Sequence, residues 1–264
     1  MGDSTQDEYA APENNRGAVN WVEHLARSGV PFGAWGGWGE PRRNGYAFNW
    51  ARSGATSAGA RVEQAPGVLA QIQSGQVSHV IIQVGINDIG QLSPQIAAGT
   101  VTDGALNHVA DNIIEAARPL AMAAPGRVMV APVQDYTGLN VIPNPEYVQL
   151  TPALSARVSA AVAKINARVV ANLPPGAVWF DWNAAMATRV GQLRTADTLV
   201  LAGNVVNIRA RCGAWNCGWV SDTYLHPESV ISGLFAQTFA DGMRAAWGVS
   251  VPVLTDSEII ARAR

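Results

Sequence analysis

Four short stretches of the chain hold the side chains that could do chemistry. They are "GDST" (2–5), "NWARSGATSAG" (49–59), "VGINDIG" (84–90) and "SDTYLHPES" (221–229). Together they supply a serine, a glycine turn, an asparagine and an Asp/His pair. A serine hydroxyl is a weak nucleophile until a base activates it, and correctly placed N–H groups stabilise the oxyanion that its attack creates. The set therefore predicts acyl transfer through a serine nucleophile.

These stretches resemble the sequence blocks of the GDSL, or SGNH, family of serine esterases and lipases. The blocks are Gly-Asp-Ser, a glycine block, Gly-x-Asn-Asp and a C-terminal Asp/His block, and they occur here in the family's order across residues 2–226. The resemblance implies a flavodoxin-like three-layer α/β/α sandwich with a mostly parallel sheet, and ester hydrolysis without a metal or other cofactor. In this family a buried strand precedes Gly-Asp-Ser. Only Met1 precedes it here, so we expect the first strand to be missing from the chain.

The resemblance assigns a role to each of three residues in the first three blocks. Ser4 is the expected nucleophile, although Asp3 or Ser4 could instead cap a helix. The backbone N–H of Gly54 is an expected oxyanion donor, and its alternative is an ordinary tight turn. The side-chain amide of Asn87 is expected to act beside Gly54 and the Ser4 N–H, and its alternative is an Asx-turn.

The last block supplies the base and the acid. His226 precedes Pro227, which favours the first turn of a helix, so we expect His226 to stand at a helix entrance and to act as the base. Asp222 departs from the family pattern Asp-x-x-His, because it stands four residues before the histidine. We expect Asp222 to be the orienting acid, with the extra residue bulging out; the alternatives are a weak acid role or another carboxylate in its place. The other histidines are predicted to be structural or surface groups: His24, His79 and His108.

The loop "FGAWGGWGEPRRNGYAFNW" (32–50) contains several aromatic residues, and aromatic faces stack well on sugars. We therefore expect Trp35 and Trp38 to bind substrate, which favours short-chain or acetylated-carbohydrate esters. They could equally pack the loop, and a catalytically inactive glycan-binding domain is the alternative function. A competing enzyme class is the α/β-hydrolases, for which "GATSAG" is one residue too long around Ser57.

The elements expected to position these residues alternate between strand and helix, which predicts βαβ units and a parallel sheet. We assign residues 1–248 to the hydrolase domain and 249–264 to a peripheral C-terminal tail. A small hairpin or excursion is expected at 198–208. The predicted strands are 46–51, 79–85, 127–133 and 177–182, and the predicted helices are 19–29, 59–75 with a break near Pro66-Gly67, 103–124, 151–173 and 227–247.

The composition of the chain limits the classes of binding partner that we expect. The formal charge of −2 and 14% charged residues provide no broad basic face, so we expect no nucleic-acid partner. No apolar run reaches the roughly 18 residues of a membrane span. Cys212 and Cys217, in "RCGAWNCG", lack the ligands of a zinc site and favour a short-loop disulfide over two thiols. A disulfide would indicate an oxidising compartment. We therefore expect a secreted or periplasmic protein whose signal peptide is absent from this chain.

Overall fold

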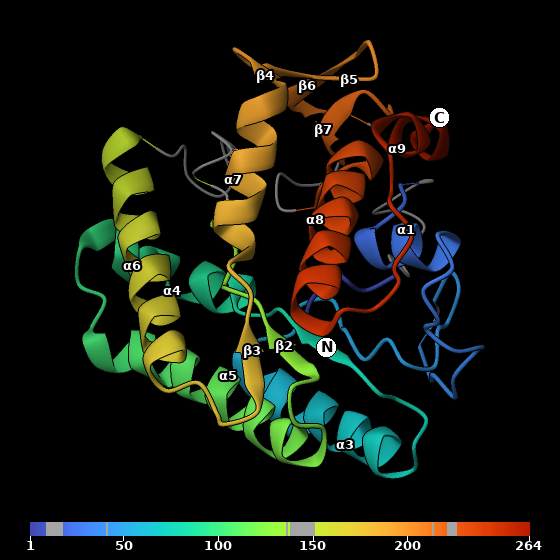
Figure 1. The fold of residues 1–264 in the computed structure, drawn as a ribbon. Coiled ribbons are helices and arrows are strands. Elements are labelled where there is room, and N and C mark those ends of the chain that lie inside the picture. Colours follow the sequence, from blue (N-terminus) through green and yellow to red (C-terminus); the bar gives the residue numbers. More distant parts are fainter. Residues whose placement is uncertain (9–17, 41, 136, 138–150, 213, 221–225) are drawn as a thin grey trace. The chain divides into compact units, whose positions relative to one another are not determined.

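The computed structural model describes residues 1–8, 18–40, 42–135, 137, 151–212, 214–220 and 226–264 (Figure 1). The chain divides into two compact units, and each is described by itself. The first unit holds the described residues among 1–4, 48–137 and 150–181. The second unit holds those among 5–47 and 182–264.

The first unit is built on a parallel sheet in the order β1-β2-β3. The strands are β1 (Val80–Ile82), β2 (Val128–Val130) and β3 (Ala177–Trp179), all within predicted strands. β2 lies between the other two strands in register. Its side chains are buried throughout, which explains the continuous apolar run in its sequence.

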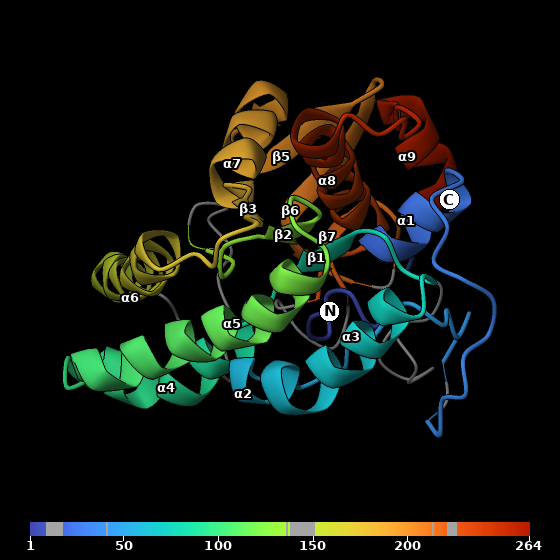
Figure 2. The same ribbon diagram turned by 60° about the horizontal axis from the view of Figure 1, so that its bottom comes forward.

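Helices connect these strands, as parallel pairing requires. α5 contacts β2 and β3, and Figure 2 shows α3 and α5 on one side of the strands. α6 begins where the sequence predicts, because the Thr151 hydroxyl accepts a hydrogen bond from Leu154 N and a proline follows. The helices of this unit are α2 (Ser57–Gly59), the π-helical turn η1 (Ala60–Gln64), α3 (Ala65–Gln73), α4 (Ile86–Ala98), α5 (Asp103–Ala123) and α6 (Pro152–Ala171).

The first two residues extend the parallel order beyond β1. Met1 N donates to the Ile81 carbonyl at 2.9 Å, and Gln83 N donates to the Met1 carbonyl at 3.3 Å. Gly2 forms a parallel bridge with Gln83. Ser4 therefore follows a segment that runs along β1, at the end where β1 leads into α4.

The second unit combines helices with the sheet order β4-β5-β6-β7. The expected hairpin is present as β5 and β6. Its two-residue turn is Ala202-Gly203, and both residues have positive φ, as a type I′ turn requires. Cys212 and Cys217 are joined in a disulfide beside this sheet. The elements are α1 (Trp21–Arg27), α7 (Trp182–Leu193), β4 (Arg194–Thr195), β5 (Thr198–Leu201), β6 (Asn204–Arg211), β7 (Cys217–Trp219), α8 (Ser229–Trp247) and α9 (Asp256–Ala263).

Aromatic side chains form much of the core of the second unit. Trp21 of α1 stacks on Phe239 of α8 with ring centroids 4.4 Å apart. Trp182 of α7 meets Phe235 edge-on at 4.5 Å. α9 packs on α8 through Ile259, which lies so close to Gly233 that any Cβ there would collide with it. α9 thus buries apolar surface against α8 within the second unit.

Two predictions about elements are wrong. Residues 46–51 do not form a strand: Tyr46 makes a single antiparallel bridge to Trp35, through hydrogen bonds from Gly36 N to the Gly45 carbonyl and from Ala47 N to the Ala34 carbonyl. The helical run at 59–75 is not broken at Pro66. The irregularity precedes it as η1, and Pro66 lies in the first turn of α3, where proline is tolerated.

Candidate active site

Ser4 lies just after the segment that pairs with β1, in a turn over residues 4–6. The residue is 6% exposed. Because residues 4–6 form a turn and not the start of a helix, the alternative in which Asp3 or Ser4 caps a helix does not apply. The position matches the general rule that sites in open α/β sheets gather beyond the carboxyl ends of the strands.

The turn around Gly54 is hydrogen-bonded to this segment. Ala55 N donates to the Arg52 carbonyl at 3.0 Å, which closes a four-residue turn, and Arg52 N donates to the Gly2 carbonyl at 3.2 Å. Gly54 has φ of +78°, a conformation that favours glycine. A Cβ on Gly54 would meet no described atom within 4 Å, so the space beside this residue is open in the described part of the chain.

Asn87 stands in the first turn of α4, directly after β1. The passage from strand to helix depends on Gly85, whose φ is +126° and whose Cβ would lie 2.6 Å from Val133 Cγ2. The Asn87 Nδ2 group donates to the Ala55 carbonyl at 2.9 Å. This long-range bond, rather than an Asx-turn, fixes the amide beside the Gly54 turn. A primary amide has two hydrogens, so the bond to Ala55 accounts for one of them.

Asp88 tethers the same region from the other side. Its carboxylate accepts hydrogen bonds at 2.8 Å from both Ser57 N and Ser57 Oγ, and Asn112 Nδ2 donates to Ser57 Oγ at 3.3 Å. Burial raises the pKa of Asp88. Ser57 is 0% exposed. A buried serine whose hydroxyl donates to a carboxylate is a structural group, which argues against the α/β-hydrolase alternative.

Within the first unit, hydrogen bonds thus bring three of the predicted blocks together. The Gly54 turn is bonded to the Ser4 segment through Gly2. Two successive residues of α4 bond to the chain at the end of that turn: Asn87 to Ala55, the last residue of the turn, and Asp88 to Ser57, two residues later.

His226 lies in the second unit, between β7 and α8. Val220 N donates to the His226 carbonyl at 3.1 Å, and Pro227 bridges to Trp219. The helix begins three residues later at Ser229, so the expected place of His226 at a helix entrance is confirmed. Asp222 falls in 221–225, outside the described residues.

Two of the other histidines have clear structural surroundings. His24 of α1 is fully buried, with Nε2 at 2.9 Å from the Ser229 carbonyl oxygen, and burial lowers its pKa to about 3. It therefore stays neutral at physiological pH. His79 lies just before β1, 2.9 Å from the Ser78 hydroxyl.

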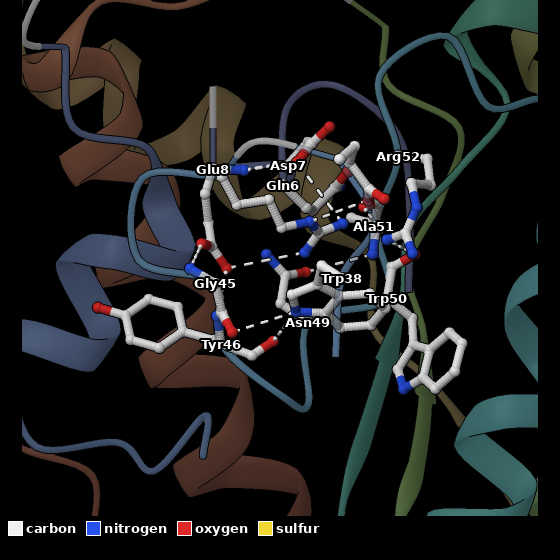
Figure 3. Close-up of polar contacts among 12 residues, drawn as sticks. Gln6, Asp7, Glu8, Trp38, Gly45, Tyr46, Asn49, Trp50, Ala51 and Arg52 are labelled. Carbon is white, nitrogen blue, oxygen red and sulfur yellow. Dashed lines mark hydrogen bonds and ion pairs between the residues drawn. The ribbon is translucent and has the colours of Figure 1, made fainter. Parts of the chain in front are cut away.

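The two tryptophans of the glycine-rich loop have different surroundings within the second unit. Trp38 donates its indole N–H to the Gly45 and Tyr46 carbonyls at 3.1 and 3.2 Å (Figure 3), and the Arg42 guanidinium lies over its ring. It therefore packs the loop. Trp35 is 58% exposed, and its indole lies against Gly45, where a Cβ would collide with the ring. One exposed indole thus lies on a glycine backbone.

A buried carboxylate supports this loop. Glu8 accepts hydrogen bonds from the backbone N–H groups of Gly45 and Tyr46 (Figure 3), and a further one from Asn44 N. Arg42 lies 3.9 Å from the same carboxylate. Several charge-assisted bonds to one short segment hold the backbone under Trp35 in place.

One residue near the Ser4 segment was missed by the sequence prediction. Gln64, the last residue of η1, hydrogen-bonds both backbone groups of Gly2. Its sequence neighbours give no signal of this contact, because Gly2 is 62 residues away.

In the part of the chain that the structure describes, no group of three or more His, Cys, Asp or Glu side chains could hold a metal ion. The described helices include none that combines the length and the hydrophobicity of a membrane span.

Comparison with known proteins identifies the family. A family model described as GDSL-like Lipase/Acylhydrolase matches residues 1–178, which include Ser4, Gly54 and Asn87. A search of curated proteins finds no match to this chain. The match is to an enzyme family, implies a small-molecule ester substrate, and gives no support to an inactive glycan-binding domain. Since it covers about two thirds of the sequence, the chain belongs to the GDSL-like lipase/acylhydrolase family of hydrolases and has the SGNH α/β fold.

Proposed function

We propose that this protein hydrolyses carboxylic esters through an acyl-enzyme intermediate, with Ser4 as nucleophile and His226 as general base. The observation that carries the proposal is the pair of hydrogen bonds that join the Gly54 turn to Gly2 and the Asn87 amide to the Gly54 turn. They gather expected oxyanion donors at the segment that bears the serine. The family match supports the reaction class.

In the first half of the reaction, Ser4 Oγ attacks the acyl carbonyl carbon while His226 takes the hydroxyl proton. The carbonyl oxygen becomes an oxyanion, which accepts hydrogen bonds from Ser4 N–H, Gly54 N–H and the second Asn87 N–H. When the tetrahedral intermediate collapses, His226 gives its proton to the departing alcohol. The acyl group stays on Ser4.

In the second half, water replaces the alcohol. His226 takes a proton from the water as its oxygen attacks the acyl carbon, and the same donors hold the second oxyanion. Collapse releases the carboxylic acid and returns the proton to Ser4. Asp222 is the proposed orienting acid for His226. The additional residue between them, relative to the family pattern, makes a Ser4–His226 dyad the alternative.

The substrate class follows from the exposed aromatic loop. An indole that rests on a glycine backbone offers a flat apolar face to a saccharide ring or a short acyl group, and Trp35 is the stronger candidate because it is the more exposed of the pair. We therefore favour short-chain or acetylated-carbohydrate esters. Trp38 acts indirectly by packing the loop.

We also propose that the protein works in an oxidising compartment, as a secreted or periplasmic enzyme. The Cys212–Cys217 disulfide supports this, because such bonds persist where thiols are not kept reduced.

The test is a panel of chromogenic esters that differ in acyl length and in the alcohol, including acetylated sugars, assayed with the parent and with Ser4→Ala. We expect Ser4→Ala to fold normally and to lose esterase activity on every substrate. Ser74→Ala is the matched control, because Ser74 lies exposed after α3, and it should keep full activity. Residual turnover of Ser4→Ala within about tenfold of the parent would refute the assignment.

A further inference from the structure

The Gln64 side chain forms two hydrogen bonds with one residue of the Ser4 segment. Gly2 N donates to Gln64 Oε1 at 2.9 Å, and Gln64 Nε2 donates to the Gly2 carbonyl at 2.8 Å. Gln64 is 2% exposed. On its other edge Gly2 is bridged to Gln83 beyond β1. The carboxamide thus presents one acceptor and one donor, as the backbone of an adjacent strand would.

The Gly2 carbonyl oxygen connects this contact to the oxyanion turn. It accepts one hydrogen bond from Gln64 Nε2 and a second from Arg52 N, the first residue of the Gly54 turn. A carbonyl oxygen has two lone pairs, so both bonds can form together. The position of this oxygen therefore couples the segment that carries Ser4 to the turn that carries Gly54.

The local structure around Gln64 is unusual. η1 ends at Gln64 with Ala65 N bonded to the Ala60 carbonyl, which makes it a π-helical turn. A π turn adds one residue to a helix and so changes the direction in which the next side chains project. Such turns occur often at functional sites. Here the turn ends at Gln64, the side chain that forms both hydrogen bonds with Gly2.

We propose that Gln64 is a positioning residue for ester hydrolysis, whose carboxamide sets the place of Ser4 relative to the Gly54 N–H. This inference rests on the proposed function, in which Ser4 is the nucleophile. Ser4 stands two residues after Gly2, so a displacement of the Gly2 peptide moves the nucleophile with it. A misplacement of about 1 Å in a catalytic group can cost on the order of 10²-fold in rate.

The test is Gln64→Glu, measured as the ratio of its kcat to that of the parent from pH 5 to pH 8. A protonated carboxyl group has one donor and one acceptor, like the amide, whereas a carboxylate has acceptors only. Because position 64 is buried, we expect a raised pKa for the new carboxyl group. The variant should therefore match the parent within about threefold at low pH, where the protonated carboxyl group keeps both hydrogen bonds to Gly2. As the new carboxyl ionises, the ratio should fall by on the order of 10²-fold, with a smaller change in KM.

Other titrating groups do not produce this signature. Arg61 and Glu63 are exposed on the same turn, and Asp3, next to Gly2, is buried. The Met1 amino group is also buried beside Gly2, and burial lowers its pKa to about 5. All four groups are present in the parent, as is His226, so their titration contributes to the kcat of both proteins. Gln73→Glu is the matched control, since it adds the same charge at an exposed position of α3. Its ratio should stay near one at every pH.

A second variant keeps the test decisive if Gln64→Glu unfolds at high pH, which circular dichroism at each pH would reveal. Gln64→Met keeps the length and volume of the side chain but forms neither bond. It should lower kcat by at least about tenfold at all pH values, with KM little changed. A ratio near one at every pH for folded Gln64→Glu, or a parent-like kcat for Gln64→Met, would overturn the inference.

The outcomes separate this inference from the proposed function. If Ser4→Ala retains activity, the nucleophile is wrong. If Ser4→Ala is inactive while the Gln64→Glu ratio stays near one at every pH, the serine mechanism stands and only the role of Gln64 is refuted.

Discussion

Replacing Asn87 with alanine removes two interactions whose consequences can be measured separately. One is the hydrogen bond from Nδ2 to the Ala55 carbonyl at 2.9 Å. The other is the proposed hydrogen bond from the second amide hydrogen to the oxyanion, which exists only after Ser4 has attacked. The first loss affects the folded state, and the second affects the transition state.

The expected magnitudes differ accordingly. Loss of one oxyanion donor should lower kcat by about 10²–10³-fold, equivalent to ~2.7–4 kcal/mol. KM should change much less, because the neutral carbonyl of the bound ester makes weaker use of the donor. Loss of the bond to Ala55 should lower the free energy of unfolding by about 0.5–1.5 kcal/mol.

The chain offers a matched control in Asn172. Its Nδ2 also donates to one backbone carbonyl at 2.9 Å, that of Arg168 at the end of α6. Asn172→Ala should produce a similar or smaller loss of stability with an unchanged kcat. The assays are steady-state hydrolysis of a chromogenic acetate ester and urea unfolding of all three proteins. A kcat for Asn87→Ala within tenfold of the parent, or an effect confined to KM, would refute the oxyanion role.

Three further predictions concern other parts of the molecule. Asp222→Asn should lower kcat by up to ~10⁴-fold and move the acidic limb of the pH–rate profile to lower pH, if this residue orients His226; an unchanged rate and limb would indicate a dyad. Because the pKa of buried His24 is lowered from 6.5 to about 3 in the folded protein, only the unfolded chain takes up its proton in that interval. The free energy of unfolding should thus decrease as pH falls from 6.5 towards 3, and His24→Gln should show a shallower decrease by urea titration. Gly67→Ala would place a Cβ 2.0 Å from an indole ring and should destabilise by about 1–3 kcal/mol, whereas Gly191→Ala in α7, with no described atom within 4 Å, should stabilise by about 0.5–1 kcal/mol in the same unfolding assay.

The parts of the fold that the sequence predicts are those with strong local signals. β1, β2 and β3 are short apolar runs between long helices, a pattern typical of buried parallel strands. α6 has Thr151 and a proline at its start, and the β5–β6 turn has a glycine where positive φ is needed. The motif residues could be found because each lies in a recognisable block.

The parts that escaped prediction depend on distant partners. Residues 46–51 alternate like a strand, but their described pairing is limited to the bridge between Tyr46 and Trp35, in which Ala47 N donates to the Ala34 carbonyl at 2.7 Å. The contact of Gln64 with Gly2 joins residues far apart in sequence and leaves no periodic trace. α4, whose N-cap is Gly85 and which contains Pro94, was not predicted from the sequence; glycine and proline are residue types that more often interrupt helices.

The most direct test of the central claim is to identify the residue that forms the covalent intermediate. The parent enzyme is treated with a serine-reactive phosphonate and digested with trypsin, and the modified peptide is found by mass spectrometry. Tryptic cleavage after Arg16 yields a peptide of residues 1–16 in which Ser4 is the only serine. We predict one phosphonyl group per chain on Ser4, with esterase activity lost in proportion to labelling. Loss of activity with the label on another residue, or full labelling of Ser4 with activity retained, would contradict the proposed mechanism.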